Sequence, residues 1–122
     1  MTKTILTVDD SRTMRDMLRL ALADAGHDVL QADDGQAGAD ALDGIARLDA
    51  IITDINMPRL DGYGFIEHVR RHAVHRAAPI LVLSTESDPA AKARARQAGA
   101  TGWIVKPFDP ARLLAAIARV AP

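Results

Sequence analysis

Acidic residues and one late lysine follow directly on apolar runs in this sequence of 122 residues. Asp9 and Asp10 close the first run, Asp54 closes the third, and Lys106 closes the last. If the runs are parallel strands, their carboxyl ends meet at one edge of a sheet, where ligands bind. Two unit charges about 4 Å apart interact with about 4 kcal/mol at an effective dielectric constant of 20. Three clustered carboxylates therefore require a cation, and their oxygen atoms select Mg²⁺ or a similar ion.

These acids predict a metal site made by Asp10, Asp54 and a backbone carbonyl, with Asp9 acting through a bound water. The alternative is helix capping, because an acid before a helix is common. One cap needs only one acid, however, and no helix pattern begins directly after Asp54. We therefore favour the metal site over capping alone.

Asp54 has a second role available, because a carboxylate can act as a nucleophile and form an acyl phosphate. Phosphoryl transfer depends on in-line positioning and on neutralising the charge of the equatorial oxygens. Mg²⁺ and Lys106 would supply positive charge. A hydroxyl at the end of the fourth apolar run, Ser84 or Thr85, would supply a hydrogen bond. The alternative for Lys106 alone is a solvated side chain, but its place before Pro107 and the need to balance three acids favour function.

Strand and helix patterns alternate along the chain and would position these residues. The strand patterns are continuous aliphatic runs rather than period-two alternations, which predicts burial on both faces of the sheet. Five such units predict one doubly wound α/β domain. The expected strands are residues 3–8, 28–32, 50–54, 79–83 and 102–105, and the expected helices are residues 14–25, 35–46, 64–75, 89–98 and 110–120.

Two of the helix patterns differ in apolar content. The first repeats apolar residues at helical spacing behind an N-cap at Asp10 or Ser11, which predicts one buried face. That face comprises Met14, Met17, Leu18, Ala21, Leu22 and Ala25. The fourth has only alanines between Lys92, Arg94 and Arg96. A helix that buries so little is expected to be a solvated surface helix, weakly held and mobile.

Composition limits the number of domains and the classes of partner. The length predicts a single domain, residues 1–122, with no output domain. Hydrophobic residues make up 48% of the chain and aromatic residues 3%, so we expect an aliphatic core. A net charge of −1 argues against nucleic-acid and membrane binding. The absence of cysteine fits a cytoplasmic protein. No apolar stretch reaches the length of a membrane span, and the first strand pattern begins too early in the sequence to leave room for a signal peptide.

Other motifs give weaker support to other chemistry. His68 and His72 have an i, i+4 spacing that can bind zinc, but H-E-x-x-H is absent, so a solvated helix face is the better interpretation. The G-Y-G at residues 62–64 lacks the third glycine and the preceding strand of a dinucleotide-binding loop. The sequence contains no nucleotide P-loop, and Ser84 does not stand in a G-x-S-x-G elbow.

Taken together, these residues resemble the receiver domains of bacterial two-component response regulators, most closely the single-domain, CheY-like chemotaxis regulators. The match rests on Asp9-Asp10, on Asp54 within D-I-N-M-P, on Ser84, and on Lys106 before a proline. Thirty residues separate Asp54 from Ser84, and fifty-two separate it from Lys106. The resemblance covers essentially the whole chain. It implies a flavodoxin-like, doubly wound five-stranded parallel sheet in the order 2-1-3-4-5, with five helices.

The resemblance also implies a role for each acidic residue. Asp54 would accept a phosphoryl group from the phosphohistidine of a sensor histidine kinase. Asp10, Asp54 and the backbone carbonyl of Asn56 would hold the required Mg²⁺, with Asp9 beside them. Lys106 would contact the acyl phosphate, and the peptide bond that follows Lys106 is expected to be cis.

A hydroxyl and an aromatic residue form the switch of this family. Ser84 and Trp103 occupy these positions here, where Thr and either Tyr or Phe are more usual, and Thr85 could share the role of Ser84. The indole N–H of Trp103 needs a partner, and the plainer interpretation of this residue is partly buried packing. Asn56 and Glu86 stand where family members tune hydrolysis of the aspartyl phosphate, so they are candidates for setting its lifetime.

Helix four, strand five and helix five form the signalling face of the family. Lys92, Arg96, Trp103 and Arg112 are then expected to contact a partner. The resemblance implies a cytoplasmic, monomeric signalling module that a chemotaxis-type histidine kinase controls and that acts on the flagellar motor switch or another phospho-dependent protein. Such a module is not an enzyme beyond catalysing its own phosphorylation and dephosphorylation.

Three alternatives stay open on the sequence. A phosphorelay shuttle would pass the phosphoryl group to a histidine phosphotransfer domain, and composition does not separate it from a chemotaxis regulator. A Mg²⁺-dependent phosphohydrolase with an Asp nucleophile generally needs a second carboxylate two residues on, where Asn56 stands. A degenerate receiver kept as a scaffold would lack key residues, whereas all five key positions are filled.

Overall fold

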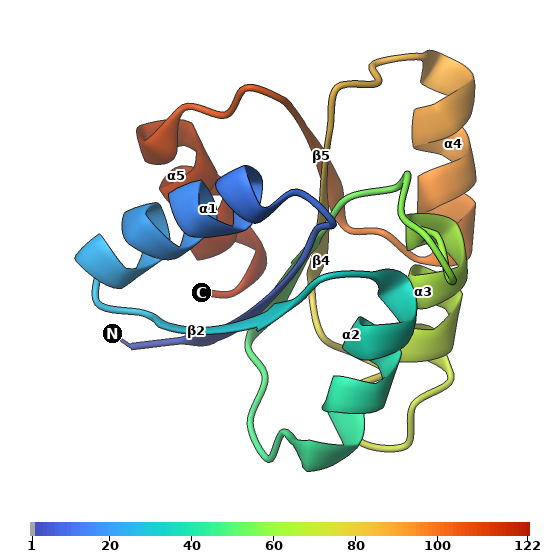
Figure 1. The fold of residues 1–122 in the computed structure, drawn as a ribbon, viewed down its shortest axis with the longest axis horizontal. Coiled ribbons are helices and arrows are strands. Elements are labelled where there is room, and N and C mark those ends of the chain that lie inside the picture. The colour runs from blue at the N-terminus through green and yellow to red at the C-terminus, as the bar shows by residue number, and fades with distance from the viewer. Residues whose placement is uncertain (1) are drawn as a thin grey trace.

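The computed structural model describes residues 2–122, which form one parallel sheet covered by helices on both faces (Figure 1). The strands are β1 (Thr4–Val8), β2 (Asp28–Ala32), β3 (Ala50–Thr53), β4 (Ile80–Ser84) and β5 (Gly102–Val105). The helices are α1 (Arg12–Asp24), α2 (Gly35–Ala41), α3 (Gly62–Arg70), α4 (Pro89–Ala98) and α5 (Pro110–Val120), with a 3₁₀ turn η1 (Leu42–Gly44) after α2. The strand order is β2-β1-β3-β4-β5, which confirms the predicted topology.

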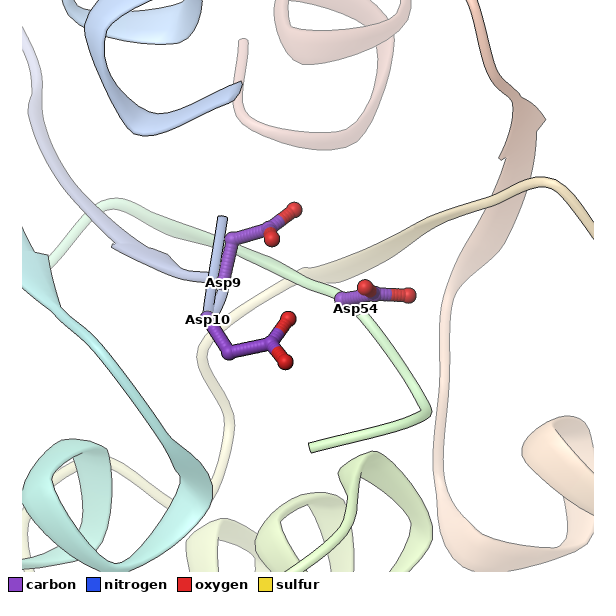
Figure 2. Close-up of side chains that lie close together, drawn as sticks. All are labelled: Asp9, Asp10 and Asp54. Carbon is purple, nitrogen blue, oxygen red and sulfur yellow. The ribbon is translucent and has the colours of Figure 1, made fainter. Parts of the chain in front are cut away.

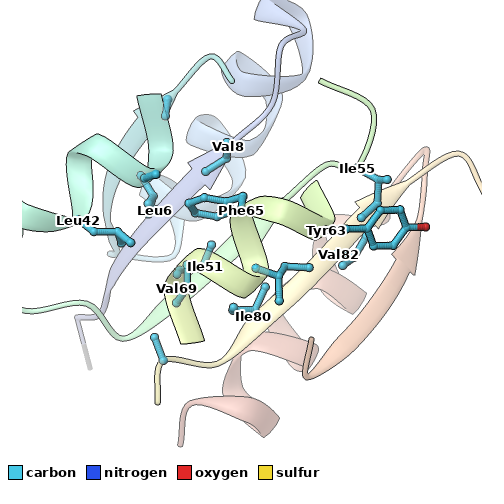
Figure 3. Close-up of a cluster of buried hydrophobic side chains, with 14 of the residues drawn as sticks. Leu6, Val8, Leu42, Ile51, Ile55, Tyr63, Phe65, Val69, Ile80 and Val82 are labelled. Carbon is cyan, nitrogen blue, oxygen red and sulfur yellow. The ribbon is translucent and has the colours of Figure 1, made fainter. Parts of the chain in front are cut away.

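Two aliphatic clusters fill the space between the sheet and its helices. Helices α1 and α5 cover one face, and α2, α3 and α4 cover the other (Figure 1). Successive strand residues point to opposite faces, so neighbouring residues of β1 enter different clusters. The cluster under α2 and α3 includes Leu6, Val8, Ile51, Phe65, Val69 and Ile80 (Figure 3). The cluster under α1 and α5 includes Ile5, Leu18, Leu22, Ile52, Leu113 and Ile117.

The expectation that all strands are buried on both faces holds for β3 and β4 but is wrong for β2 and β5. Asp28, Leu30 and Gln31 of β2 are exposed, and so is Val105 of β5. Both strands lie at an edge of the sheet, where the flanking helices cover only part of each strand. An uninterrupted apolar pattern does not distinguish a central strand from an edge strand.

Two helices end earlier than predicted. Helix α2 gives way to η1 after Ala41 instead of continuing to residue 46, in a stretch where glycine lowers helix propensity. Helix α3 begins at Gly62, because the Asp61 carboxylate accepts a hydrogen bond from the Gly64 N–H and caps the helix there. It ends at Arg70 instead of residue 75.

The chain after α3 is held in a turn by two side chains. The Arg70 guanidinium donates to the carbonyl oxygens of Arg76 and Ala78 at 2.8 and 2.7 Å. The His72 ring, predicted to lie on a solvated helix face, is only 12% exposed and bonds the Asp43 carboxylate at 2.9 Å. These contacts compete with continuation of the helix, so His68 and His72 do not share one helix face.

Helix α1 buries a narrower face than predicted. The Ser11 hydroxyl accepts from the Met14 N–H, so Ser11 and not Asp10 caps the helix. Ala25 is exposed and the Met17 side chain is 42% exposed, in contrast to the prediction. Helix α5 covers α1 from one side only, and Met17 lines a shallow groove between the two helices, with Leu114 opposite. None of the helices within residues 2–122 has the length and hydrophobicity of a membrane span.

Candidate functional site

Three carboxylates converge where β1 and β3 end. One oxygen atom from each of Asp9, Asp10 and Asp54 lies within 4.8 Å of the other two (Figure 2). The parallel pairing of β1 with β3 causes this convergence, because Val8 pairs with Thr53 and the Asp54 N–H donates to the Val8 carbonyl at 2.9 Å. Asp9 is buried and Asp10 is exposed, so the cluster opens to solvent on the Asp10 side.

Lys106 reaches into the same cluster from the end of β5. Its Nζ donates to Asp9 Oδ2 at 2.9 Å and to Asp54 Oδ2 at 3.1 Å. The Lys106 N–H donates to the Ser84 carbonyl, which aligns the ends of β4 and β5. The Lys106–Pro107 peptide bond is cis, as expected. The side chains of Lys106 and Asp54 are each 12% exposed, so this ion pair is largely shielded from water.

Burial and charge act in opposite directions on these groups. Burial raises the pKa of Asp54 above 3.8, with a smaller contribution from Asp9, although the Ile55 N–H and Lys106 stabilise the ionised form. Burial also disfavours the charged form of Lys106, but hydrogen bonds and charge from Asp9 and Asp54 outweigh it and raise the pKa of Lys106. One ammonium therefore faces three carboxylates, and the cluster retains an excess of negative charge.

The donor set of this cluster fits a hard divalent cation. Carboxylate oxygens are the ligands that Mg²⁺ prefers, and Mg²⁺ is usually held by one or two carboxylates together with other oxygen donors. Asn56 is exposed in the loop that follows Asp54, and its backbone carbonyl is the further oxygen ligand that the family resemblance implies. Asp9, Asp10 and Asp54 are therefore available as ligands.

The loop after β4 is held by two side chains that the sequence predicted as a switch. The buried Ser84 hydroxyl accepts from the Glu86 N–H at 3.1 Å, whereas the neighbouring Thr85 is exposed. The Trp103 indole N–H donates to the Glu86 carbonyl at 2.9 Å. Glu86 thus links Ser84 to Trp103 through its backbone, a contact that its side-chain type could not have indicated. The Trp103 ring also packs on the edge of the core, so packing and hydrogen bonding coexist.

The predicted partner-contact residues fall into two places. Lys92, Arg96 and Trp103 line one small groove between α4 and β5. Arg112 is exposed on α5 and does not line that groove. The structure therefore brings together three of the four residues and leaves the fourth on a neighbouring helix.

Two contacts near the site were not predicted. Arg59, in the loop between β3 and α3, forms a two-point ion pair with Asp34 at the start of α2. Tyr63 at the start of α3 contacts Arg94 of α4. The D-G pair at residues 34–35 is a visible helix-start signal, but the partner of Asp34 lies 25 residues away and has no local signature.

Comparisons with known proteins agree with this geometry. The sequence model of the response regulator receiver domain matches residues 5–118. The chain belongs to this family. The Helicobacter pylori chemotaxis protein CheY1 is 38% identical over 107 residues, which cover 87% of this chain and 86% of CheY1. The topology, the acidic cluster and this identity together make the chain a CheY-like receiver domain of a two-component system.

Solved receiver structures superpose closely on this one. The chemotaxis protein CheY4 of Vibrio cholerae has a TM-score of 0.90 and 44% identity, covering 98% of this chain and 99% of CheY4. The receiver domain of the Pseudomonas aeruginosa sensor histidine kinase PA1611 has a TM-score of 0.90 and 26% identity, covering 99% and 98% of the two chains. That structure has a magnesium ion coordinated in its active-site cleft. These relatives are signalling receivers rather than classical enzymes, and CheY-like receivers interact with histidine kinases.

Proposed function

We propose that this receiver domain signals through phosphorylation, and that Asp54 accepts a phosphoryl group from a histidine kinase. One observation carries this proposal: the carboxylates of Asp9, Asp10 and Asp54 cluster within 4.8 Å, with the Lys106 ammonium bonded to two of them. Such an arrangement concentrates negative charge and one fixed cation at the place where a phosphoryl group would bind.

The transfer step follows from the chemistry of the acceptor. An Asp54 carboxylate oxygen attacks the phosphorus of a phosphohistidine, a P–O bond forms, the P–N bond breaks, and the imidazole nitrogen keeps the electron pair. Lys106, released from Asp54, would contact a phosphoryl oxygen while it stays bonded to Asp9. Burial raises the pKa of Asp54, and a bound cation would favour the ionised nucleophile.

Magnesium is the cofactor that the donor set supports. Asp10, Asp54 and the Asn56 carbonyl would hold it directly, and Asp9 would act through a bound water. When bound, Mg²⁺ neutralises charge that develops on the phosphoryl oxygens. Asn56 and Glu86, which lie in the loops after β3 and β4, are proposed to set the lifetime of the aspartyl phosphate.

The signal would leave the site through the loop after β4. Rotation of the Ser84 hydroxyl toward a phosphoryl oxygen would break the hydrogen bond that it accepts from the Glu86 N–H. The carbonyl of the same residue, Glu86, accepts the hydrogen bond of the Trp103 indole. Movement of Trp103 would then reshape the groove that Lys92 and Arg96 line. Thr85 is exposed and is the weaker candidate for this role, although it could share it.

The partners are proposed from the relatives and from charge. The similarity to CheY1 and CheY4 supports a cytoplasmic role in chemotaxis, under a chemotaxis-type kinase and upon the flagellar motor switch or another phospho-dependent protein. The face formed by α4, β5 and α5 carries the cations Lys92, Arg96 and Arg112, so it favours a partner with an acidic surface. We propose that the protein acts as a monomer and binds neither nucleic acid nor membrane, in keeping with its net charge of −1.

The test is fluorescence of Trp103, the only tryptophan in the chain. Mg²⁺ is titrated first, followed by beryllium fluoride as a mimic of the phosphoryl group, with Asp54→Ala as the control. We expect a change at each step in the wild type and no response to beryllium fluoride in the variant. A wild-type protein that responds to neither would contradict the proposed function.

A further inference from the structure

The loop between β3 and α3 contains an unfavourable backbone conformation. Arg59 has a φ of +67°, the left-handed region that side chains other than glycine rarely adopt. The Leu60 N–H donates to the Pro58 carbonyl at 2.8 Å, which closes a three-residue turn around Arg59. Three-residue turns with a positive central φ are rare and strained. Such a conformation persists only where surrounding contacts hold it.

An ion pair holds this turn. Arg59 Nε donates to Asp34 Oδ2 at 2.7 Å, and Arg59 Nη2 donates to Asp34 Oδ1 at 3.0 Å. The Asp34 side chain is only 9% exposed, and its Oδ1 also accepts from the Ala37 N–H, which caps α2. The hydrogen bond from Arg59 lowers the pKa of Asp34, and the same contact raises the pKa of Arg59. Two-point geometry with a guanidinium is the strong form of such a pair.

The ion pair joins the loop that carries Asp54 to the loop after β2, which neighbours Asp9. Arg59 lies three residues after Asn56, in the loop of Asp54. Asp34 lies two residues after Ala32, whose carbonyl accepts from the Asp9 N–H at 3.1 Å. The two loops also pack against each other, since a Cβ at position 35 would lie 2.0 Å from the Leu60 carbonyl oxygen.

We propose that the Arg59–Asp34 ion pair is a positioning device for the Mg²⁺ site: it holds the Asn56 carbonyl in register with Asp10 and so sets the affinity for Mg²⁺. Neither residue belongs to the cluster of three carboxylates that would hold the ion. The inference rests on the proposed function, because it assumes that the Asn56 carbonyl is a ligand.

Electrostatics alone predicts the opposite effect. Arg59 is a cation near a cation-binding site, so its removal should strengthen Mg²⁺ binding by reducing charge repulsion. Loss of a positioning contact should weaken Mg²⁺ binding instead, because residues that orient metal ligands typically contribute about 10- to 100-fold in affinity. The sign of the change therefore separates the two accounts.

The experiment measures the Mg²⁺ dissociation constant by titration calorimetry, with Trp103 fluorescence as a second readout. Arg59→Gly removes the ion pair and permits the positive φ, so it relieves strain while it loses the contact. Arg59→Asn provides a second variant, because Asn tolerates a positive φ and is too short to reach Asp34. Arg47→Gly is the matched control: Arg47 also forms an exposed ion pair, with Asp49 at 3.2 Å, at the far end of the sheet.

We expect both Arg59 variants to bind Mg²⁺ about tenfold more weakly, and Arg47→Gly to bind it as the wild type does. Asp34→Asn retains a capping side chain for α2. Because both substitutions break the same ion pair, the double variant Asp34→Asn with Arg59→Gly should bind Mg²⁺ no more weakly than Arg59→Gly alone. Unchanged or stronger Mg²⁺ binding in the Arg59 variants would overturn the positioning role while leaving the proposed function intact. A wild-type protein that binds no Mg²⁺ would overturn both.

Discussion

At the scale of single residues, Asp54 must be ionised to act as the proposed nucleophile, yet its surroundings in the folded protein disfavour the ionised form. Its burial raises its pKa, and Asp9 adds repulsion, so the ionised carboxylate is unfavourable in the folded state. A carboxyl group with a raised folded pKa contributes stability at low pH, and this contribution is lost as the pH rises through the folded pKa. At neutral pH, ionised Asp54 therefore costs stability.

Asp54→Asn should accordingly stabilise the metal-free protein at pH 7 while it abolishes phosphorylation. The gain should be about 1 kcal/mol, the usual scale of a stabilising substitution, or roughly 4 °C in Tm for a domain of this size. Thermal unfolding followed by circular dichroism in the presence of a chelator measures it, and the gain should shrink as the pH falls through the raised pKa of Asp54. A lower Tm for Asp54→Asn at pH 7 would show that Lys106 already compensates the acidic cluster.

The identity of the switch hydroxyl is also a question at this scale. Ser84 is buried and bonds the Glu86 N–H, whereas Thr85 is exposed. We expect Ser84→Ala to keep the fluorescence response of Trp103 to Mg²⁺ and to lose its response to beryllium fluoride. Thr85→Ala should keep both responses, and the reverse pattern would assign the role to Thr85.

At the scale of elements, α4 is held to the domain by little apolar surface. Ala95 is its only buried residue, in agreement with the prediction that this helix buries little. Tyr63 of α3 makes two contacts with α4: its ring centroid lies 4.0 Å from the Arg94 guanidinium carbon, and its hydroxyl reaches the Ala91 carbonyl at 3.5 Å. Tyr63 lies beside Ile55 in the core (Figure 3). One side chain therefore connects the acceptor loop to α4.

Tyr63→Leu should loosen α4 without displacing α3, because leucine still fills the core but makes neither contact with α4. A cation–π contact is worth about 0.5–1 kcal/mol at an exposed site, so amide hydrogen exchange in α4 should accelerate about threefold. Mass spectrometry of peptides from α4 measures this. Tyr63→Phe is the control, since it keeps the ring under Arg94 and should change exchange little. Equal exchange rates in wild type and Tyr63→Leu would refute the role of Tyr63.

At the scale of the whole molecule, the acidic cluster couples metal binding to stability. A ligand that binds only the folded state stabilises it by mass action, by about 2.7 kcal/mol at one hundred times its dissociation constant. Mg²⁺ at that excess should therefore raise Tm by roughly 10 °C. The same titration with Asp10→Asn should give a smaller rise, because one proposed ligand loses its charge. A Tm that does not depend on Mg²⁺ would argue against a metal site.

Much of the fold and the core of the site could be predicted because they depend on local patterns. Buried strand patterns ending in acids, with helices between them, led to the correct strand order once the family resemblance was added. The helix end after Arg70 was missed, because it depends on contacts such as that of Arg70 with Ala78, which no local pattern encodes. The end after Ala41 was missed because the predicted range ran on through a stretch in which glycine lowers helix propensity. The exposure of β2 was missed for the same reason, since position in the sheet is not a property of the strand itself.

The sequence by itself determined which groups are available: three carboxylates and a lysine at strand ends, and a hydroxyl and an indole near them. The tertiary structure decided which of these groups touch. Lys106 bonds Asp9 across 97 residues of sequence, Trp103 meets the backbone of Glu86, and Arg59 closes on Asp34. The physical reason is that side-chain type and spacing set local conformation, whereas a contact between distant residues exists only after the sheet has brought its strand ends together.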